Sequence, residues 1–231
     1  MDIKITDRTI PKDFLRYTPR RDSYLLKLCA GKKVLHIGAS DWPYTKEQME
    51  RGNLLYARIG EIAAEQLGID LDKEATEFLN NQNIPNSKVV VGDMNEMQSL
   101  AFSPDVIIFG ETLEHLMNLE IALSNVKQVM RADTELIISV PNAFHFLNFV
   151  YALFRKEHQH PDHSVTFTYK TLTQLLGKNN LNVTDFRFTF LDSSRLEFLN
   201  WKGKIMYGIE RLMVRISPLF AETLLVSVKK K

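Results

Sequence analysis

Short apolar runs alternate with amphipathic stretches along most of this chain, and this alternation limits its fold more than any other feature. The apolar runs have the length and the β-branched content of buried strands: they are "KVLHI", "LGIDL", "SKVVVGD", "PDVIIFGE" and "TELIISVPN". Apolar residues recur with helical spacing over residues 45–66, 73–82 and 119–130. Strand–helix–strand units of this kind pack as an open sheet covered by helices. The sequence therefore predicts an α/β fold with a doubly wound, mostly parallel sheet.

The charge balance and the cysteine count restrict the setting and the partners. The chain has 231 residues, with 29 Lys and Arg against 28 Asp and Glu, so it has no strong net field to attract nucleic acid. Its one cysteine, Cys29, excludes an internal disulfide. Its most apolar stretch is shorter than the roughly 20 residues that a membrane span needs. We expect a cytoplasmic protein with a single domain over residues 1–231 and a small-molecule partner, not a nucleic acid.

Several predicted strands end in a glycine or an acidic residue. Ligands of open parallel sheets bind beyond the carboxyl ends of the strands, and these ends carry Gly38, Asp70, Asp93 and Glu111. A glycine turn lets the backbone approach a ligand closely. A carboxylate after the second strand can accept both hydroxyls of a ribose, and one after the third strand can meet the exocyclic amine of adenine. The strand ends therefore predict a ligand that contains adenosine.

Five motifs resemble those of class I S-adenosylmethionine-dependent methyltransferases in type, order and spacing: "VLHIGAS", "GIDLD", "VVVGDMNEM", "DVIIFGETLEHL" and "IISVPN". The resemblance implies a seven-stranded sheet whose last strand, near residues 223–229, runs antiparallel between its neighbours. It also implies the cofactor S-adenosylmethionine, with Gly38 under its methionine part, Asp70 on the ribose hydroxyls, and Asp93 with Met94 around the adenine. The predicted cofactor site comprises His36, Gly38, Ala39, Asp70, Leu71, Asp93, Met94 and Glu111.

Two positions depart from the family pattern. His36 stands where the family usually has an acidic residue, and Ser40 where it has a second glycine. A protonated histidine cannot hold the cofactor's ammonium group, so either Asp41 or Glu111 substitutes, or binding is weakened. The simplest interpretation of His36 is a strand histidine paired with a neighbouring backbone group or carboxylate. The departures also leave open a degenerate, non-catalytic fold that acts as a binding module.

A nicotinamide-dependent dehydrogenase is the less favoured alternative. The glycine pattern of its dinucleotide-binding turn does not continue after Gly38.

Two polar clusters lie where the chemistry of methyl transfer would take place: "ETLEH", residues 111–115, and "HQHPDHSVTF", residues 158–167. Their pattern resembles the ubiquinone-biosynthesis O-methyltransferases and the small-RNA terminal 2′-O-methyltransferases, in which such residues hold a divalent ion beside the acceptor hydroxyl. The resemblance implies Mg²⁺ or Mn²⁺ as a second cofactor. The matching ligands here are Glu111, Glu114, His115 and His163.

The predicted reaction is methyl transfer to a hydroxyl of a small molecule or glycan, with His163, Glu114 and His115 as the catalytic residues. Without a metal, His163 acts as the general base, and Glu114 caps or orients a loop. A zinc site formed by His158, His160 and His163 is disfavoured, because the spacing around Pro161 fixes no geometry and no cysteine lies nearby. "HPDH" segments also resemble bacterial methyltransferases of surface-polysaccharide biosynthesis, which indicates a sugar hydroxyl.

Three further segments are expected to surround the ligands. Residues 143–168 and 194–221 are predicted to be insertions that form a lid over the acceptor. Residues 1–32 are predicted to form a helical cap, with a helix through "FLRYTPRRDSYLLKL" across the cofactor mouth, where Tyr17 or Arg20 could touch the methionine carboxylate.

The second insertion carries an amphipathic helix. Its apolar stripe contains Ile205, Ile209, Leu212, Met213 and Ile216, and its basic residues lie opposite the stripe. We expect the stripe to pack against the protein's own domain. A homodimer and peripheral contact with an anionic membrane surface are the alternatives.

Overall fold

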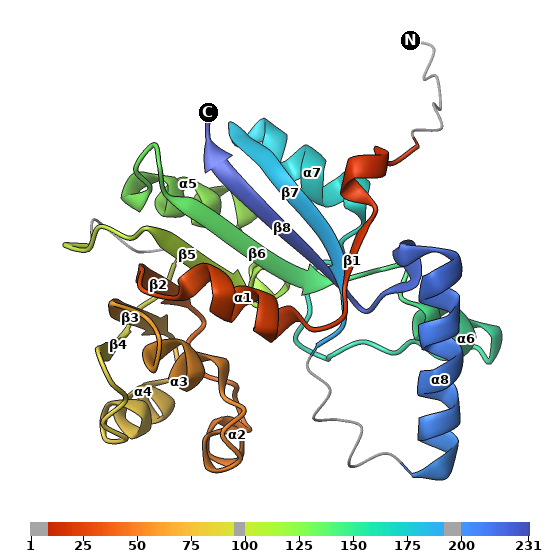
Figure 1. The fold of residues 1–231 in the computed structure, drawn as a ribbon, viewed down its shortest axis with the longest axis horizontal. Helices are drawn as coiled ribbons and strands as arrows, with labels where there is room; N and C mark the ends of the chain where they lie inside the picture. The colour runs from red at the N-terminus through yellow and green to blue at the C-terminus, as the bar shows by residue number, and fades with distance from the viewer. Residues whose placement is uncertain (1–8, 95–99, 192–199) are drawn as a thin grey trace.

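The computed structural model describes residues 9–94, 100–191 and 200–231, and its centre is one eight-stranded sheet (Figure 1). The strands are β1 (Arg16–Thr18), β2 (Lys33–Ile37), β3 (Glu65–Asp70), β4 (Ser87–Val91), β5 (Val106–Gly110), β6 (Glu135–Pro141), β7 (Leu181–Thr189) and β8 (Thr223–Lys230). The α-helices are α1 (Arg21–Cys29), α2 (Thr45–Glu50), α3 (Leu55–Gly60), α4 (Lys73–Asn80), α5 (Leu119–Val129), α6 (Phe146–Leu153), α7 (Tyr169–Lys178) and α8 (Trp201–Ile216). Short 3-10 turns are η1 (Lys12–Phe14), η2 (Leu113–His115) and η4 (Pro218–Phe220).

The strand order is β1-β7-β8-β6-β5-β2-β3-β4. The strands pair in parallel except β8, which runs antiparallel between β6 and β7. The predicted α/β fold with a mostly parallel sheet is therefore confirmed, and so is the antiparallel last strand. The sheet has one strand more than the seven expected, because β1 pairs with the outer edge of β7.

The extra strand replaces the first part of the predicted N-terminal helix. The prediction of one helix through residues 14–28 was wrong. Residues 16–18 are extended, and α1 begins only at Arg21. Pro19 accounts for the difference, because a proline disfavours the helical conformation of the residue before it. Residues 1–8 of the predicted cap lie outside the described residues.

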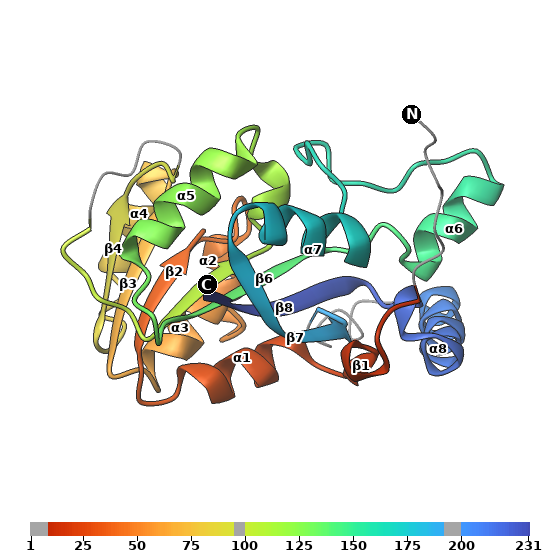
Figure 2. The same ribbon diagram turned by 90° about the horizontal axis from the view of Figure 1, so that it is seen from above.

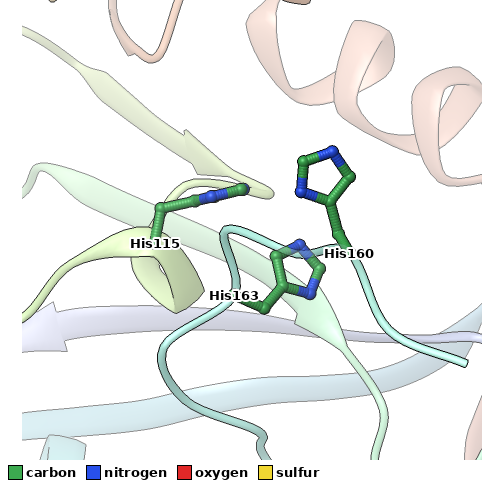
Figure 3. A group of neighbouring side chains, drawn as sticks. All are labelled: His115, His160 and His163. Carbon is green, nitrogen blue, oxygen red and sulfur yellow. The ribbon is translucent and has the colours of Figure 1, made fainter. Parts of the chain in front are cut away.

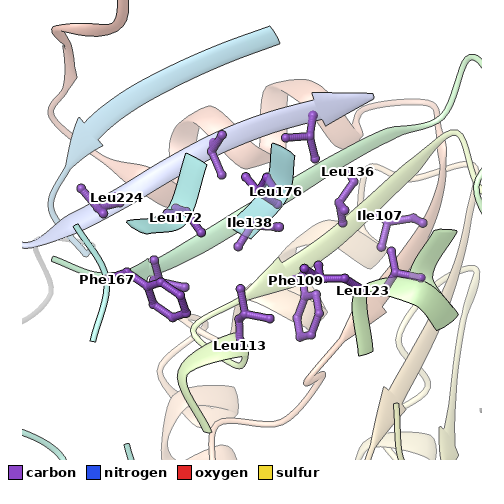
Figure 4. Packing of buried hydrophobic residues seen from close by; sticks show 14 of the residues in the cluster. Ile107, Phe109, Leu113, Leu123, Leu136, Ile138, Phe167, Leu172, Leu176 and Leu224 are labelled. Atoms are coloured by element: carbon purple, nitrogen blue, oxygen red, sulfur yellow. The ribbon is translucent and has the colours of Figure 1, made fainter. Parts of the chain in front are cut away.

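Side chains of the central strands alternate between the two faces of the sheet. In β6, Leu136 and Ile138 pack on one face and Ile137 packs on the other. Helices α5 and α7 cover the first face, where their Leu123 and Leu176 are fully buried (Figure 4). Helices α1 and α3 cover the opposite face (Figure 2). Burial on both faces explains why these strands are apolar throughout, as parallel strands usually are.

The predicted helix over residues 45–66 is two short helices instead of one. Helix α2 ends at Glu50, helix α3 begins at Leu55, and β3 already starts at Glu65. Gly52 between the helices has a φ of 68°, a left-handed conformation that glycine adopts readily and that interrupts a helix.

The two insertions lie together at one end of the molecule, beyond the β1 and β7 edge of the sheet (Figures 1 and 2). The first contributes α6 and the second contributes α8 and η4, and the ring of Phe146 contacts that of Phe220. The expected packing of the α8 stripe on the domain was wrong. Glu210 and Val214 are buried instead, and Ile205, Ile209, Leu212 and Ile216 are exposed.

No helix in the described part of the chain is long and apolar enough to cross a membrane. The assignment of residues 1–231 to a single domain, with its insertions as a lid, stays a prediction. Residues 194–199 of the second insertion lie outside the described residues.

Ile138 tests the packing of the sheet against α7. It is fully buried in β6, so Ile138→Ala should lower the free energy of unfolding by about 2 to 5 kcal/mol through lost burial and a residual cavity. Ile121 on α5 is 48% exposed, and Ile121→Ala should cost less than about 1 kcal/mol. Urea unfolding of both variants measures the difference, and equal losses would contradict the described core.

Candidate functional site

The carboxyl ends of the central strands open into a cleft with a volume of about 1150 Å³. All eight residues of the predicted cofactor site line it: His36, Gly38, Ala39, Asp70, Leu71, Asp93, Met94 and Glu111. The predicted catalytic residues Glu114, His115 and His163 line the same cleft. The topology therefore gathers both predicted groups at one edge of the sheet, as the switch-point rule requires.

Gly38 ends β2 in a conformation that requires glycine. Its φ is 72°, and a Cβ atom at this position would lie 2.3 Å from Thr112 Oγ1. Its amide donates a hydrogen bond to the Ile69 carbonyl at 2.9 Å, which fixes the turn against β3. The backbone is consequently bare where the methionine part of a cofactor is expected.

The Asp70 carboxylate at the end of β3 is held by backbone donors. Asp70 Oδ2 accepts from the Ser40 amide at 2.7 Å, and Oδ1 accepts from the Asp72 amide at 3.0 Å. A carboxylate offers about four lone-pair sites, so each oxygen keeps one for a ligand hydroxyl. This arrangement fits a ribose, because both hydroxyls can donate to one rigidly held group.

Two apolar side chains stand beside these carboxylates. Leu71 is 65% exposed although it is apolar, whereas Met94 is buried under the cleft. The Met94 carbonyl accepts a hydrogen bond from Asn125 Nδ2 at 2.6 Å, which anchors the segment after β4 to α5. Leu71, Met94 and Asp93 therefore provide apolar surfaces and a carboxylate in the region expected to hold adenine. Residues 95–97 of the quoted motif lie outside the described residues.

His36 is buried, and the expected pairing of its ring is not found at Nδ1. Among the residues that the structure describes, no hydrogen-bond partner reaches Nδ1, and the ring lies 5.7 Å from that of Tyr56. Burial, together with the nearby Arg21 charge, lowers the pKa of His36 to about 3. The imidazole is therefore neutral near pH 7 and carries no charge that would repel a cofactor ammonium.

Arg21 is the residue that the sequence interpretation missed. It begins α1 and lines the cleft, whereas the expected Tyr17 and Arg20 are not among the lining residues that the structure describes. Arg21 Nη1 lies 3.3 Å from Glu111 Oε1, and Nε donates to Asp22 Oδ1 at 2.9 Å. Burial raises the pKa of Glu111, and the Arg21 charge opposes that rise. The sequence would have indicated Arg21 only if the first residue of α1, one position after Arg20, had been predicted correctly.

The loop before α7 is bound to the η2 turn, and this contact unites the two polar clusters. The Ser164 amide donates to the Glu114 carbonyl at 2.8 Å, which places His163 Nε2 3.9 Å from Glu114 Oε1. Glu114 is 1% exposed, and neither carboxylate oxygen has a hydrogen-bond partner within the described ranges. Burial, reinforced by the Glu111 charge, raises the pKa of Glu114 to about 9.

Three imidazoles converge at the mouth of this turn (Figure 3). His115, His160 and His163 each offer a ring nitrogen, and these nitrogens lie within 4.8 Å of one another. Of the four predicted metal ligands, the group includes His115 and His163, while Glu111 pairs with Arg21. His158, part of the disfavoured zinc triplet, stacks on Tyr151 instead. Burial and the neighbouring imidazoles lower the pKa of His163 to about 4.

Comparison with known proteins identifies the family. A family model described as a methyltransferase domain matches residues 17–185, which is most of the chain. This chain belongs to the methyltransferase domain family. It is a methyltransferase that uses S-adenosylmethionine as the methyl donor, and the Gly38 turn and the Asp70 carboxylate fit that cofactor. A comparison with curated proteins found no match.

Solved structures share the fold of this methyltransferase. A TehB-like S-adenosylmethionine-dependent methyltransferase from Corynebacterium glutamicum is 16% identical, with a TM-score of 0.56 over 91% of this chain and 87% of that chain. A methyltransferase from Archaeoglobus fulgidus is 18% identical, with a TM-score of 0.57 over 90% of each chain. The N-methyltransferase NodS from Bradyrhizobium japonicum, in complex with S-adenosyl-L-homocysteine, is 13% identical, with a TM-score of 0.56 over 91% of this chain and 85% of that chain.

Asp70 and Asp72 form a matched pair for testing the cofactor site. Asp70→Ala should weaken S-adenosylhomocysteine binding by about 1 to 3 kcal/mol, because ligand hydroxyls lose a partly buried acceptor. Asp72 caps α4 through a bond from the Ala75 amide at 3.1 Å, so Asp72→Ala should cost about 1 kcal/mol of stability and leave affinity unchanged. Calorimetry measures both, and the reverse pattern would show that the ribose site is wrongly placed.

His36 should make stability depend on pH. Below the ordinary histidine pKa of 6.5 the unfolded chain takes up a proton that folded His36 refuses until about pH 3. The contribution of a neutral His36 to the stability of the fold is therefore complete above pH 6.5 and is lost as the pH falls towards 3. Between pH 6.5 and about pH 4 the free energy of unfolding of the native protein should fall by about 3 kcal/mol more than that of the His36→Leu variant. Urea unfolding at each pH measures this, and parallel profiles would exclude the effect.

Proposed function

We propose that this methyltransferase transfers the methyl group to a hydroxyl of a small molecule or glycan. The main support is that one cleft contains both Asp70, at the expected cofactor site, and the cluster of Glu114 with His115, His160 and His163. A hydroxyl is a weak nucleophile until its proton is removed, so it requires such groups. An amine needs only to be neutral. The methylation of an amine, the activity named for NodS, is the competing function.

S-adenosylmethionine, when bound, supplies a methyl group on a positively charged sulfur, and the acceptor oxygen bonds to that carbon as the carbon–sulfur bond breaks. The residues of this chain have to align the acceptor and remove its proton. His163 is the candidate base, because its lowered pKa leaves the ring free to accept a proton. The Glu114 carboxyl, 3.9 Å from His163 Nε2, would stabilise the resulting imidazolium once ionised. We assign His115 to orienting the acceptor and His163.

A histidine with so low a pKa is a weak base, and this favours a second candidate mechanism. General bases work best when their pKa lies near the working pH, whereas the pKa of His163 is about 4. A divalent cation would lower the pKa of the acceptor hydroxyl directly. His115, His160 and His163 would hold it, with the unpartnered Glu114 carboxylate beside them. Three imidazoles suit zinc or another transition metal better than Mg²⁺, which prefers oxygen ligands.

The first insertion, residues 143–168, supports a lid over the acceptor, whereas no described residue of the second insertion lines the cleft. His145, Leu147 and Asn148 line the cleft, together with residues 158–163 of the loop that follows α6 in the same insertion. These segments contribute both apolar and polar groups to the lining of the cleft. Such a mixed lining suits an acceptor that offers hydroxyls on a carbon skeleton, including a sugar of polysaccharide biosynthesis.

The acceptor class is tested with paired probes. Purified protein is incubated with S-adenosylmethionine and either catechol or a nucleoside-diphosphate sugar, and each probe is paired with its amine analogue. Release of S-adenosylhomocysteine with hydroxyl probes supports the proposal, and turnover with amines alone would contradict it. If calorimetry detects no binding of S-adenosylmethionine or S-adenosylhomocysteine at millimolar concentration, the chain is the non-catalytic binding module instead.

Chelation separates the two ways of activating the hydroxyl. If a cation acts, a strong chelator should lower turnover at least about tenfold, and Zn²⁺ or Mn²⁺ should restore it while cofactor affinity stays unchanged. Calorimetry with Zn²⁺ gives an independent readout, since His160→Ala should weaken ion binding and the stacked His158→Ala should not. Turnover that survives chelation but is lost in His163→Gln assigns the step to the histidine base. Single and double variants of His163 and Glu114 should then give non-additive losses.

A further inference from the structure

Helix α8 presents a continuous apolar stripe to solvent. Its members are large and exposed: Trp201 (67%), Ile205 (54%), Ile209 (42%), Leu212 (56%) and Ile216 (71%). With about 3.6 residues per turn, these positions fall within an arc of roughly 80°. The stripe therefore runs the whole length of the helix along one side, a pattern that differs from singly scattered surface residues.

The opposite side of α8 attaches the helix to the protein. Glu210 and Val214 are 5% and 4% exposed, and both lie roughly opposite the centre of the stripe. The Glu210 carboxylate contacts His145 Nε2 at the start of α6. The exposed apolar side of α8 is therefore opposite the side that carries this polar contact, and the helix itself lies at the end of the molecule (Figure 1).

The charges around the stripe all have one sign. Lys202 borders one edge, while Lys204 and Arg215 border the other, and all three are exposed. The only carboxylate in α8 is Glu210, which is buried. The stripe is therefore bordered by positive charge on both sides within this helix.

Helix α6 adds to the same end of the molecule. It contains no charged residue, and Phe149 and Leu153 are 58% and 66% exposed. Exposed Arg155 and Lys156 follow after Phe154, which caps the end of the helix. The two packed helices thus combine exposed apolar side chains with basic ones.

We propose that the α8 stripe binds an anionic membrane surface, with the helix lying in the plane of the interface. An amphipathic helix with Trp and aliphatic residues on one side and bordering Lys and Arg inserts its apolar side among acyl chains and places its cations at lipid phosphates. The 16-residue helix is too short to span the bilayer. A second copy of the same face would bring its Lys and Arg residues towards those of the first, whereas an anionic surface neutralises both edges.

Membrane binding through α8 would bring the bilayer close to the acceptor end of the cleft. His145 lines the cleft and also contacts Glu210 of α8, so the membrane-facing helix and the acceptor end of the cleft are joined by one pair of side chains. Binding would hold that end of the cleft at the lipid surface. This inference holds for either candidate mechanism and does not depend on the identity of the acceptor.

The full chain is tested by co-sedimentation with vesicles. We expect binding to vesicles of equal parts phosphatidylcholine and phosphatidylglycerol, weaker binding as salt rises, and little binding to phosphatidylcholine alone. Ile209→Glu with Leu212→Glu should lower binding at least about tenfold, and so should joint reversal of Lys202, Lys204 and Arg215 to Glu. Ile121→Glu, an equally exposed isoleucine on α5, should bind as the native chain does.

Each variant is also measured for S-adenosylhomocysteine affinity and thermal midpoint, so that loss of folding is recognised. The result that overturns the proposal is absent binding to anionic vesicles, or binding that the α8 variants and Ile121→Glu weaken equally. Analytical ultracentrifugation provides the other decisive outcome. A dimer of the native chain that dissociates in Ile209→Glu with Leu212→Glu would assign this face to a second copy and overturn the membrane proposal.

Discussion

The close contact between Gly38 and Thr112 is the constraint on which the rest of the site depends. Gly38 has a left-handed backbone, and the space that a Cβ would occupy is already taken by Thr112 Oγ1, which donates to the Gly110 carbonyl at 2.9 Å. The end of β2 therefore packs directly on the end of β5. Since β2 begins the cofactor half and β5 leads into the turn with Glu114, this contact sets the separation between donor and acceptor.

Most of the cofactor half could be predicted from the sequence because it follows the chain locally. Gly38 and Asp70 stand at the ends of apolar runs, and parallel pairing brings such ends together without further information. Arg21 and His160 could not be placed in the same way. Their positions depend on where α1 begins after Pro19 and on how the loop before α7 attaches to the Glu114 carbonyl, and neither contact leaves a periodic pattern.

The orientation of α8 shows a different limit of prediction from sequence. Its amphipathic pattern was evident, but periodicity states only that a helix has two unlike sides and does not say which side is buried. Here the inner side contains Glu210, a residue that would normally face water. The partner that makes its burial tolerable is His145, which is 65 positions away in the sequence. A long-range polar contact therefore reversed the expected packing.

The site has several groups that a purely structural core would avoid. His36 Nδ1 and both carboxylate oxygens of Glu114 are buried without a hydrogen-bond partner among the described residues, and each such atom costs about 1 to 3 kcal/mol. Burial of His36, Glu114 and the neighbouring Glu111 moves the pKa of each towards the neutral form of its side chain. A neutral His36 avoids repelling a cationic ligand, and a neutral Glu114 loses its proton most readily when positive charge arrives. The neutral forms keep unpaired buried charge out of the site when it is empty, and a bound cation would favour ionisation of Glu114 but not of His36.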